Sequence, residues 1–197
     1  MKPLAAGRAS EIFDLGDGRV LRRGGNPQRE ARVMRHAAAN GYPVPEVLEV
    51  SEDALVLRRI DGPTMLRDAF RRPWRLRRYA SLLADLHRRL HEIEADGGRQ
   101  LHMDLHPENV ILSPAGPFVV DWTNARAGEP ALDVAMTWVI LGTSGGVPGR
   151  VFVRAFLRHF DRAEIRRALP AAGELRLGDP NVTEREKRAV RRLIAAG

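Results

Sequence analysis

Residues 101–122 read LHMDLHPENVILSPAGPFVVDW, and they carry the most informative pattern of the chain. Asp104 and Asn109 bracket a tight, proline-containing loop that leads into the apolar run Val-Ile-Leu. A second apolar run, Phe-Val-Val, follows Ser-Pro-Ala-Gly-Pro and ends at Asp121. The two runs are predicted to pair as a hairpin, which would bring Asp121 back beside Asn109. Two carboxylates and one amide are therefore expected at one end of the hairpin.

This set of side chains suits phosphoryl transfer. A magnesium ion prefers oxygen ligands and takes only a few of them from the protein. Asn109 and Asp121 would supply those ligands, while Asp104, held off the metal, would orient and deprotonate the acceptor hydroxyl. Catalysis of this kind depends mainly on positioning and electrostatics, because the transition state needs little covalent help.

The spacing of these residues resembles a known catalytic loop. In protein kinases the catalytic aspartate and the metal-binding asparagine are separated by four residues, as Asp104 and Asn109 are here. With His-Met-Asp-Leu-His-Pro-Glu-Asn in the loop and Val-Val-Asp-Trp in place of Asp-Phe-Gly, the chain resembles the aminoglycoside phosphotransferase and choline kinase branch of the kinase-like superfamily. The resemblance implies a two-lobed α+β fold of protein-kinase type, Mg²⁺, ATP with GTP as an alternative donor, and a small-molecule acceptor that carries a hydroxyl.

The resemblance also implies a nucleotide site in the first sixty residues. Gly-Arg-Ala-Ser at 7–10 lies where the family has its nucleotide-covering loop. Arg22 occupies the strand position at which kinases usually have a phosphate-contacting lysine, and Glu30 on the following helix is placed to pair with it. The implied nucleotide-binding residues are Gly7, Arg8, Ser10, Arg22, Glu30, Arg58, Arg59 and Ile60, of which the last three form the hinge that meets the purine.

Three further residues are expected to support the loop. His102 and His106 would brace it through hydrogen bonds, and Asp133 lies where the family has a structural aspartate behind the metal loop. An alternative reading of His102, Asp104 and His106 is the metal cluster of a hydrolase, since imidazoles and carboxylates at alternate positions bind zinc. The run into Pro-Glu-Asn and the later Val-Val-Asp favour the kinase reading.

The chain departs from the family pattern in two ways. Arginine replaces lysine at position 22, which keeps the charge but changes its shape. This leaves a catalytically silent nucleotide-binding or scaffolding module as the alternative function. Only about ten residues, 92–101, separate the long helix from the catalytic loop. The acceptor-binding region is therefore expected to be shortened and built mostly from the C-terminal helices.

The chain changes character at Asp-Gly-Pro, residues 61–63. Before this break the expected elements are strands at 11–15, 19–22, 47–50 and 54–57 and a helix at 27–40. After it, apolar periodicity predicts helices at 74–93, 130–141 and 151–160 and a last helix that begins at Thr183 with a capping box. We therefore expect a β-rich nucleotide-binding lobe, 1–60, and a helical catalytic lobe, 61–197, with a cleft between them.

The composition limits the remaining function classes. The chain has 197 residues, 32 basic and 25 acidic, for a net charge of +7, and no cysteine. The lack of cysteine excludes disulfides, thiolate zinc sites and cysteine nucleophiles. No signal peptide or apolar span is evident, so we expect a cytoplasmic protein without a membrane partner. The arginine-rich run 71–79 is expected to be a solvated helix face and not a nucleic-acid site; the oligomeric state stays open.

Two other motifs have simpler explanations. His87 and His91 have the spacing of a zinc signature, but an arginine stands where the general-base glutamate should be, so packing is expected. The run 142–146 fits the Gly-x-Ser-x-Gly pattern of a hydrolase. A helix precedes it where a strand is needed, so a flexible loop is expected instead.

Overall fold

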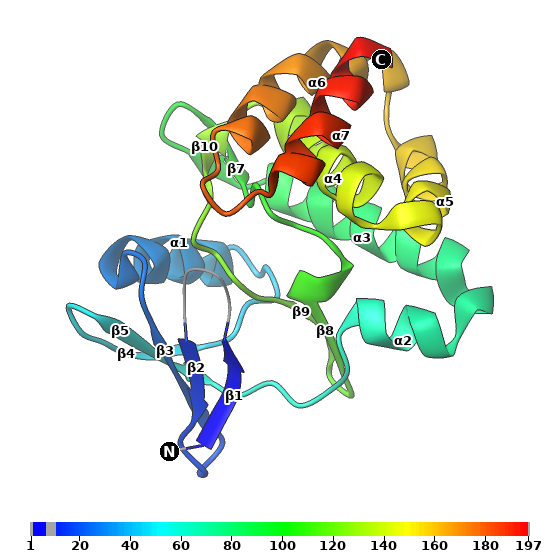
Figure 1. Cartoon of the computed structure of the whole chain (residues 1–197). Coiled ribbons are helices and arrows are strands. Elements are labelled where there is room, and N and C mark those ends of the chain that lie inside the picture. Colours follow the sequence, from blue (N-terminus) through cyan, green and yellow to red (C-terminus); the bar gives the residue numbers. More distant parts are fainter. Residues whose placement is uncertain (1, 7–10, 197) are drawn as a thin grey trace.

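The computed structural model describes residues 2–6 and 11–196. Gly7, Arg8 and Ser10 of the expected nucleotide loop therefore lie outside the described residues. The N-terminal part is an antiparallel sheet in the order β1-β2-β3-β5-β4 (Figure 1). Its strands are β1 (Lys2–Ala6), β2 (Glu11–Asp14), β3 (Arg19–Arg23), β4 (Val47–Val50) and β5 (Ala54–Arg58).

The helix α1 (Pro27–Ala39) packs against this sheet. It begins as the sequence predicts, because the Asn26 side chain accepts a hydrogen bond of 3.0 Å from the Arg29 N–H, and proline takes the first helical position. It ends just before Gly41, whose φ of 72° favours glycine. Met34 and its apolar neighbours on the same face are buried, so the helix is held by packing as well as by its caps.

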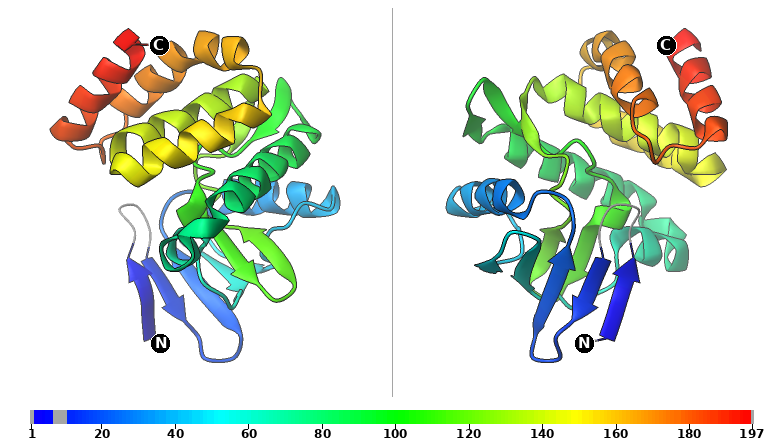
Figure 2. Two further views of the ribbon diagram at one scale, coloured as in Figure 1. Left: turned by 90° about the vertical axis from the view of Figure 1, so that its right-hand side faces the viewer. Right: turned by 60° about the vertical axis from the view of Figure 1, so that its left-hand side comes forward.

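The rest of the chain is mostly helical, and its C-terminal helices lie at the opposite end of the molecule from strand β1 (Figure 2). The helices are α2 (Met65–Arg71), α3 (Leu76–His91), α4 (Pro130–Ser144), α5 (Gly146–Phe156), α6 (Arg162–Leu177) and α7 (Glu184–Ala196). Short 3₁₀ helices cover Pro73–Arg75, Pro107–Asn109 and Leu157–His159. Two small sheets complete this part, β8 (Val110–Ser113) with β9 (Gly116–Val119), and β6 (Glu94–Ala95) with β7 (Gly98–Leu101) and β10 (Arg126–Gly128).

Several of these elements confirm the sequence analysis, and one region corrects it. The predicted hairpin after the catalytic loop is present as β8–β9, with Val110 opposite Val119. The run 142–146, expected as a flexible loop, is instead the corner between α4 and α5. A Cβ on Gly149 would lie 2.4 Å from the Leu141 carbonyl oxygen, so glycine allows the two helices to meet closely. The corner is shaped by packing, which the local pattern does not reveal.

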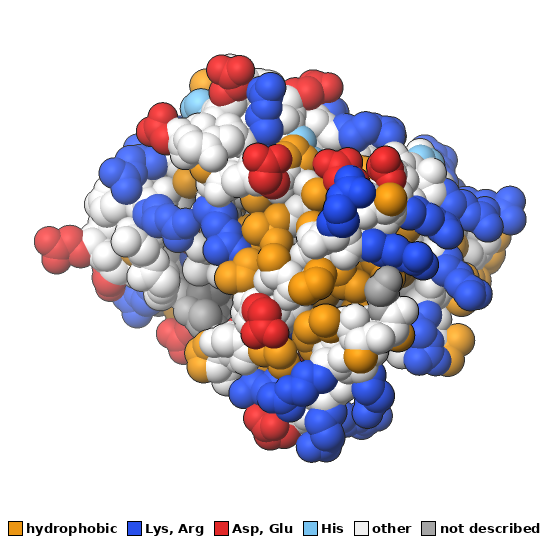
Figure 3. Space-filling view, turned by 90° about the horizontal axis from the view of Figure 1, so that it is seen from above, with side chains coloured by type: hydrophobic (Ala, Val, Ile, Leu, Met, Phe, Trp, Pro, Cys, Tyr) orange, Lys and Arg blue, Asp and Glu red, His pale blue; other side chains and the backbone are white. Residues whose placement is uncertain are grey.

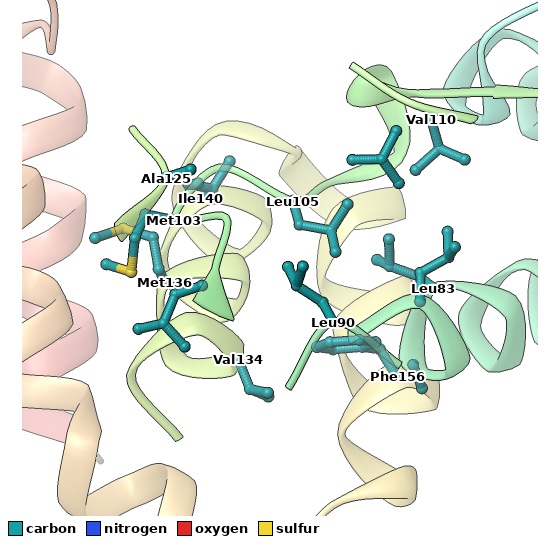
Figure 4. Packing of buried hydrophobic residues seen from close by; sticks show 14 of the residues in the cluster. Leu83, Leu90, Met103, Leu105, Val110, Ala125, Val134, Met136, Ile140 and Phe156 are labelled. Carbon is teal, nitrogen blue, oxygen red and sulfur yellow. The ribbon is translucent and has the colours of Figure 1, made fainter. Parts of the chain in front are cut away.

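The core is one connected cluster that joins the loop to the helices. Figure 4 shows Leu105, from the loop after β7, in the same cluster as Leu83 and Leu90 of α3 and Phe156 of α5. Helix α4 lies at its centre, which explains why its sequence is apolar on most sides. Within the described residues, no helix is both long and apolar enough to cross a bilayer.

Candidate active site

The loop between β7 and β8 places Asp104 against Asn109. The Asn109 Nδ2 group donates a hydrogen bond of 2.9 Å to the Asp104 backbone oxygen and lies 3.2 Å from its carboxylate Oδ2. Proline begins the single 3₁₀ turn, and the His106 ring nitrogen Nδ1 accepts from the Glu108 N–H at 3.3 Å. The local sequence therefore sets the turn, and the turn brings the two expected residues into direct contact.

The hairpin β8–β9 then returns the chain to this loop. The Val120 N–H donates to the Asn109 carbonyl oxygen at 3.0 Å, so Asp121 follows directly after a backbone link to the loop. Asp121 has a φ of 64°, a left-handed conformation that costs free energy in a residue with a side chain. Its carboxylate Oδ1 accepts hydrogen bonds from Thr123 Oγ1 at 2.8 Å and from Arg22 Nη2 at 3.0 Å. The structure thus connects Asp104, Asn109 and Asp121 in one region.

Arg22 and Glu30 form a buried ion pair, as expected, with 2.5 Å between Nη1 and Oε2. Each residue is less than 5% exposed, and Arg22 Nη2 also donates to Thr123 Oγ1 at 2.5 Å. Glu30 Oε1 accepts from the Trp122 backbone N–H at 3.2 Å. Burial raises the pKa of Glu30, although the Arg22 charge opposes this. The pair therefore ties β3, α1 and the segment after β9 together.

Asp133, on the first turn of α4, holds the backbone of the loop between β7 and β8. Its buried carboxylate accepts from the Met103 N–H at 2.7 Å and from the His102 N–H at 3.1 Å. Met103 has a φ of 65°, and these two hydrogen bonds compensate for the strain of that conformation. His91 Nε2 and His87 Nδ1 lie 3.0 and 3.5 Å from the same oxygen, Oδ2.

The charge state of Asp133 follows from these partners. Burial alone would raise the pKa of its carboxyl, but the neighbouring His87 and His91 rings outweigh burial and hold that pKa well below its usual range. The side chains of His87, His91 and Asp133 also lie close enough together to hold a metal ion. Because the Asp133 oxygens already accept two backbone N–H groups, we assign this cluster to polar packing behind the loop.

The two loop histidines occupy different surroundings. His102 is fully buried, with Nε2 at 3.2 Å from the Val120 carbonyl and Nδ1 accepting from the Asp104 N–H at 3.3 Å. Burial lowers its pKa, so the neutral ring fits this donor and acceptor pair. His106 Nε2 lies 3.5 Å from Asp104 Oδ1. Both rings are thus used within the loop, which disfavours the reading of 102–106 as a zinc cluster.

Asp104 is held as an anion. Burial would raise the pKa of its carboxyl, but the hydrogen bond from His106 and the positive potential of its surroundings outweigh that effect and lower the pKa. The carboxylate is therefore ionised at neutral pH, as a group that accepts a proton must be.

The expected hinge lies at the end of β5. The backbone N–H groups of Arg58 and Arg59 donate to Glu46 O and Gly18 O, each at 2.9 Å. The Ile60 N–H, in contrast, donates to no other described residue. The two arginine side chains pair with acidic neighbours, Arg58 with Glu46 at 2.8 Å and Arg59 with Asp61 at 2.9 Å. Within this segment, the Ile60 backbone N–H therefore has no hydrogen-bond acceptor among the described residues.

Sequence reasoning missed two residues that organise the site. Thr123 links Arg22 to Asp121, and Arg29 donates to the Ala125 carbonyl oxygen at 2.5 Å. Arg29 lies one residue before Glu30 on α1, so the same helix turn anchors the segment after β9 twice. A hydroxyl residue two positions after Asp121 was the sequence signal that could have identified Thr123.

The buried histidines predict a pH-dependent stability. Burial lowers the pKa of His87 and of His102 below the ordinary value of 6.5, so below that pH the unfolded chain binds protons that the folded chain does not. We expect the free energy of unfolding to fall as the pH drops below about 6.5, by at most about 1.4 kcal/mol per pH unit for each ring. Urea denaturation between pH 7 and 5 measures the slope.

Two variants test which histidine causes the slope of the unfolding free energy against pH. His87→Gln is expected to remove about half of it, whereas the exposed His159→Gln leaves it unchanged. A slope that His87→Gln leaves at its full value would contradict the assignment.

Comparisons with known proteins identify the family of the chain. The model of the phosphotransferase enzyme family (APH) matches residues 1–100 and 98–177. Thiamine kinases from Salmonella paratyphi B and Salmonella newport are each 38% identical over 58 residues, a match that covers 26% of this chain and only 21% of each thiamine kinase.

Solved structures with low sequence identity share the fold. A choline/ethanolamine kinase family protein from Mesorhizobium loti superposes with a TM-score of 0.63 at 21% identity, covering 98% of this chain and 85% of that one. The ADP-bound aminoglycoside phosphotransferase APH(2'')-Ib has a TM-score of 0.69 at 15% identity, covering 98% and 91%. A Plasmodium vivax ethanolamine kinase has a TM-score of 0.66 at 10% identity, covering 97% and 81%. The expected two-lobed kinase-like fold is confirmed.

Proposed function

The chain belongs to the phosphotransferase enzyme family, and from this membership we propose that it transfers the γ-phosphate of ATP to a hydroxyl group of a small-molecule acceptor. Residues 1–60 would hold the nucleotide, and residues 61–197 would supply the catalytic groups and the acceptor pocket. The observation that supports this most is the contact between Asp104 and Asn109, linked through the β8–β9 hairpin to Asp121, Arg22 and Glu30.

The donor atoms at this site fit a magnesium ion. The Asn109 amide nitrogen is occupied by Asp104, which leaves its oxygen Oδ1 without a hydrogen bond from any described residue. Asp121 accepts through Oδ1, so its Oδ2 is likewise open among the described residues, and the side chain is 43% exposed. One carboxylate and one amide oxygen match the ligands that Mg²⁺ takes from proteins. When bound there, the ion would neutralise charge on the phosphate oxygens.

Asp104 would act on the acceptor. Its carboxylate is held in place by Asn109 and His106, and its lowered pKa keeps it ionised. It would orient the acceptor hydroxyl and accept its proton as the bond from the oxygen to phosphorus forms. The proton ends on the Asp104 carboxylate, and ADP leaves with the electron pair of the broken bond.

Charge near Asp104 bears on the choice of acceptor. Arg176 of α6 pairs with Asp179 at 3.3 Å. Burial raises the pKa of Asp104, whereas His106, His102 and, to a smaller extent, Arg176 lower it. A polycationic aminoglycoside would be repelled by this guanidinium. We therefore expect neutral or anionic acceptors to be preferred.

The proposal is tested by nucleotide binding followed by product analysis. ATP with Mg²⁺ is expected to raise the melting temperature of the protein, with GTP as the comparison donor. ADP release is then measured with thiamine, choline, ethanolamine, an aminoglycoside and neutral sugars, and the phosphorylated acceptor is identified by mass spectrometry. No binding of either nucleotide would refute the proposal. Binding without transfer to any acceptor would favour the silent module, for which the burial of Arg22 against Asp121 is the supporting observation.

Arg22 provides a separate prediction about the nucleotide. The double variant Arg22→Gln with Glu30→Gln removes the guanidinium without leaving Glu30 buried and unpaired. We expect the Kd for ATP with Mg²⁺ to rise about tenfold, because charge-assisted contacts to phosphate are lost. Isothermal titration calorimetry measures the change. The exposed neighbour Arg23→Gln is the control, and an unchanged Kd in the double variant would remove Arg22 from the nucleotide site.

A further inference from the structure

A pocket lies among the C-terminal helices. It has a volume of about 330 Å³ and is lined by residues from α4, α5, α6, α7 and the 3₁₀ turn after α5. Its apolar wall is made of Trp138, Val153, Leu157, Ile165 and Leu193. Figure 3 views the molecule from the side of these helices and shows hydrophobic side chains at the surface between groups of Lys and Arg.

The pocket is separate from the proposed active site. The face of α4 that meets the catalytic loop carries Asp133 and Thr137, whose hydroxyl donates to the Leu105 carbonyl oxygen at 2.7 Å. Trp138 and Gly142 line the pocket from a different face of the same helix. None of the lining residues belongs to the nucleotide, metal or loop-support sets described above.

Four arginines surround this apolar wall. Arg150 and Arg154 lie four residues apart on α5, and Arg162 and Arg166 lie four residues apart in the first part of α6. All four side chains belong to exposed residues, and none forms an ion pair or hydrogen bond with another described residue. No aspartate or glutamate lines the pocket.

This arrangement has an electrostatic cost that a ligand could offset. Like charges four residues apart on a helix repel each other, and two such pairs face one pocket here. Guanidinium groups bind carboxylate, sulfonate and phosphate oxygens through paired hydrogen bonds. The apolar wall, with a half-buried tryptophan, suits the hydrocarbon part of a ligand.

We propose that this pocket binds a small anionic amphiphile, with its apolar body against Trp138 and Leu157 and its acidic group between the arginines of α5 and α6. The volume is within the range of small-molecule sites. The proposal does not depend on the phosphotransferase activity, because it concerns a different face of α4.

The test uses a fluorescent probe of this chemistry. The probe is 8-anilinonaphthalene-1-sulfonate, and N-phenyl-1-naphthylamine, which has the same rings without the sulfonate, is the matched neutral probe. We expect saturable binding of one sulfonate probe per folded chain, with energy transfer from Trp138 that is lost in Trp138→Phe. The neutral probe should bind about tenfold more weakly, because it makes no charge-assisted hydrogen bonds.

Variants locate the binding. Arg154→Gln with Arg162→Gln is expected to weaken binding of the sulfonate probe about tenfold or more. Arg32→Gln with Arg35→Gln removes the same charge from exposed positions on α1 and should leave binding unchanged. Gly142→Leu should fill the pocket, since a Cβ there already lies 3.5 Å from Trp138 and 3.6 Å from Leu193. Circular dichroism checks that each variant is folded.

Three results would overturn the proposal. One is equal affinity of the two double-arginine variants for the probe, and another is equal affinity of the wild type for the charged and neutral probes. The third comes from vesicles, because an acidic lipid headgroup shares the ligand chemistry. Sedimentation with phosphatidylglycerol vesicles but not phosphatidylcholine vesicles, without binding of the free probe, would assign the arginines to a membrane surface instead.

Discussion

Replacing Asp104 with asparagine is expected to lower the turnover number for phosphate transfer about a thousandfold while nucleotide binding is retained. The amide has nearly the same shape as the carboxylate but cannot accept the proton of the acceptor hydroxyl. Asp104 contacts Asn109 and His106 and not the Arg22–Glu30 pair, so the nucleotide side of the site should be undisturbed. The effect should therefore appear in kcat, with little change in the Kd for ATP.

The measurement pairs ADP release, in the presence of an acceptor found by screening, with calorimetric titration of ATP and Mg²⁺. Asp85→Asn is the matched control, because Asp85 is half-exposed on α3 and pairs only with Arg88 among the described residues. Turnover by Asp104→Asn equal to that of Asp85→Asn would show that Asp104 is not the catalytic base.

Replacing Asp133 with alanine is expected to cost about 3–5 kcal/mol in the free energy of unfolding. The change leaves the Met103 and His102 N–H groups buried without an acceptor, at a residue with a positive φ. It also leaves His87 and His91 without the carboxylate they face. Unsatisfied buried donors and lost charge pairs are among the few causes of destabilisation this large.

Urea denaturation at neutral pH measures this loss of unfolding free energy. Asp85→Ala, which removes an exposed carboxylate from α3, is the control. Because the pKa of Asp133 is lowered in the folded state, its stabilising contribution is complete above the ordinary value of 3.8 and is lost as the pH falls through the folded value. The difference in the free energy of unfolding between wild type and Asp133→Ala should therefore persist at pH 5 and become smaller below pH 3.8. If Asp133→Ala lowers the free energy of unfolding at neutral pH no more than Asp85→Ala does, the role assigned to Asp133 is contradicted.

Local chemistry was sufficient for the elements with strong boundary signals. Helix α1 begins at Asn26-Pro27, and α7 begins with the Thr183–Glu186 capping box, in which each residue hydrogen-bonds the other's backbone N–H, at 2.9 and 3.2 Å. The β8–β9 hairpin followed from two apolar runs around a turn. These signals act over a few residues, so the sequence displays them directly.

Short elements that depend on pairing or packing with other elements were missed. Strand β1 exists through its pairing with β2, and β7 pairs with β10, about 25 residues further along the chain. The short helix α2 was also not expected, although Thr64 caps it by accepting from the Arg67 N–H at 3.1 Å. Short elements of this kind owe their stability to packing more than to local propensity.

The sequence was enough to predict Asp104, Asn109 and Asp121 as candidate site residues, because their spacing around one loop and one hairpin is a local property. The partners that these groups meet depend on tertiary packing. Arg22 contacts Asp121, 99 residues away, and the Asp133 carboxylate holds the backbone of Met103, 30 residues away. The four arginines beside Trp138 likewise share a pocket only because α5 and α6 pack against α4. Such contacts are set by how helices and sheets pack, and no local pattern specifies that packing.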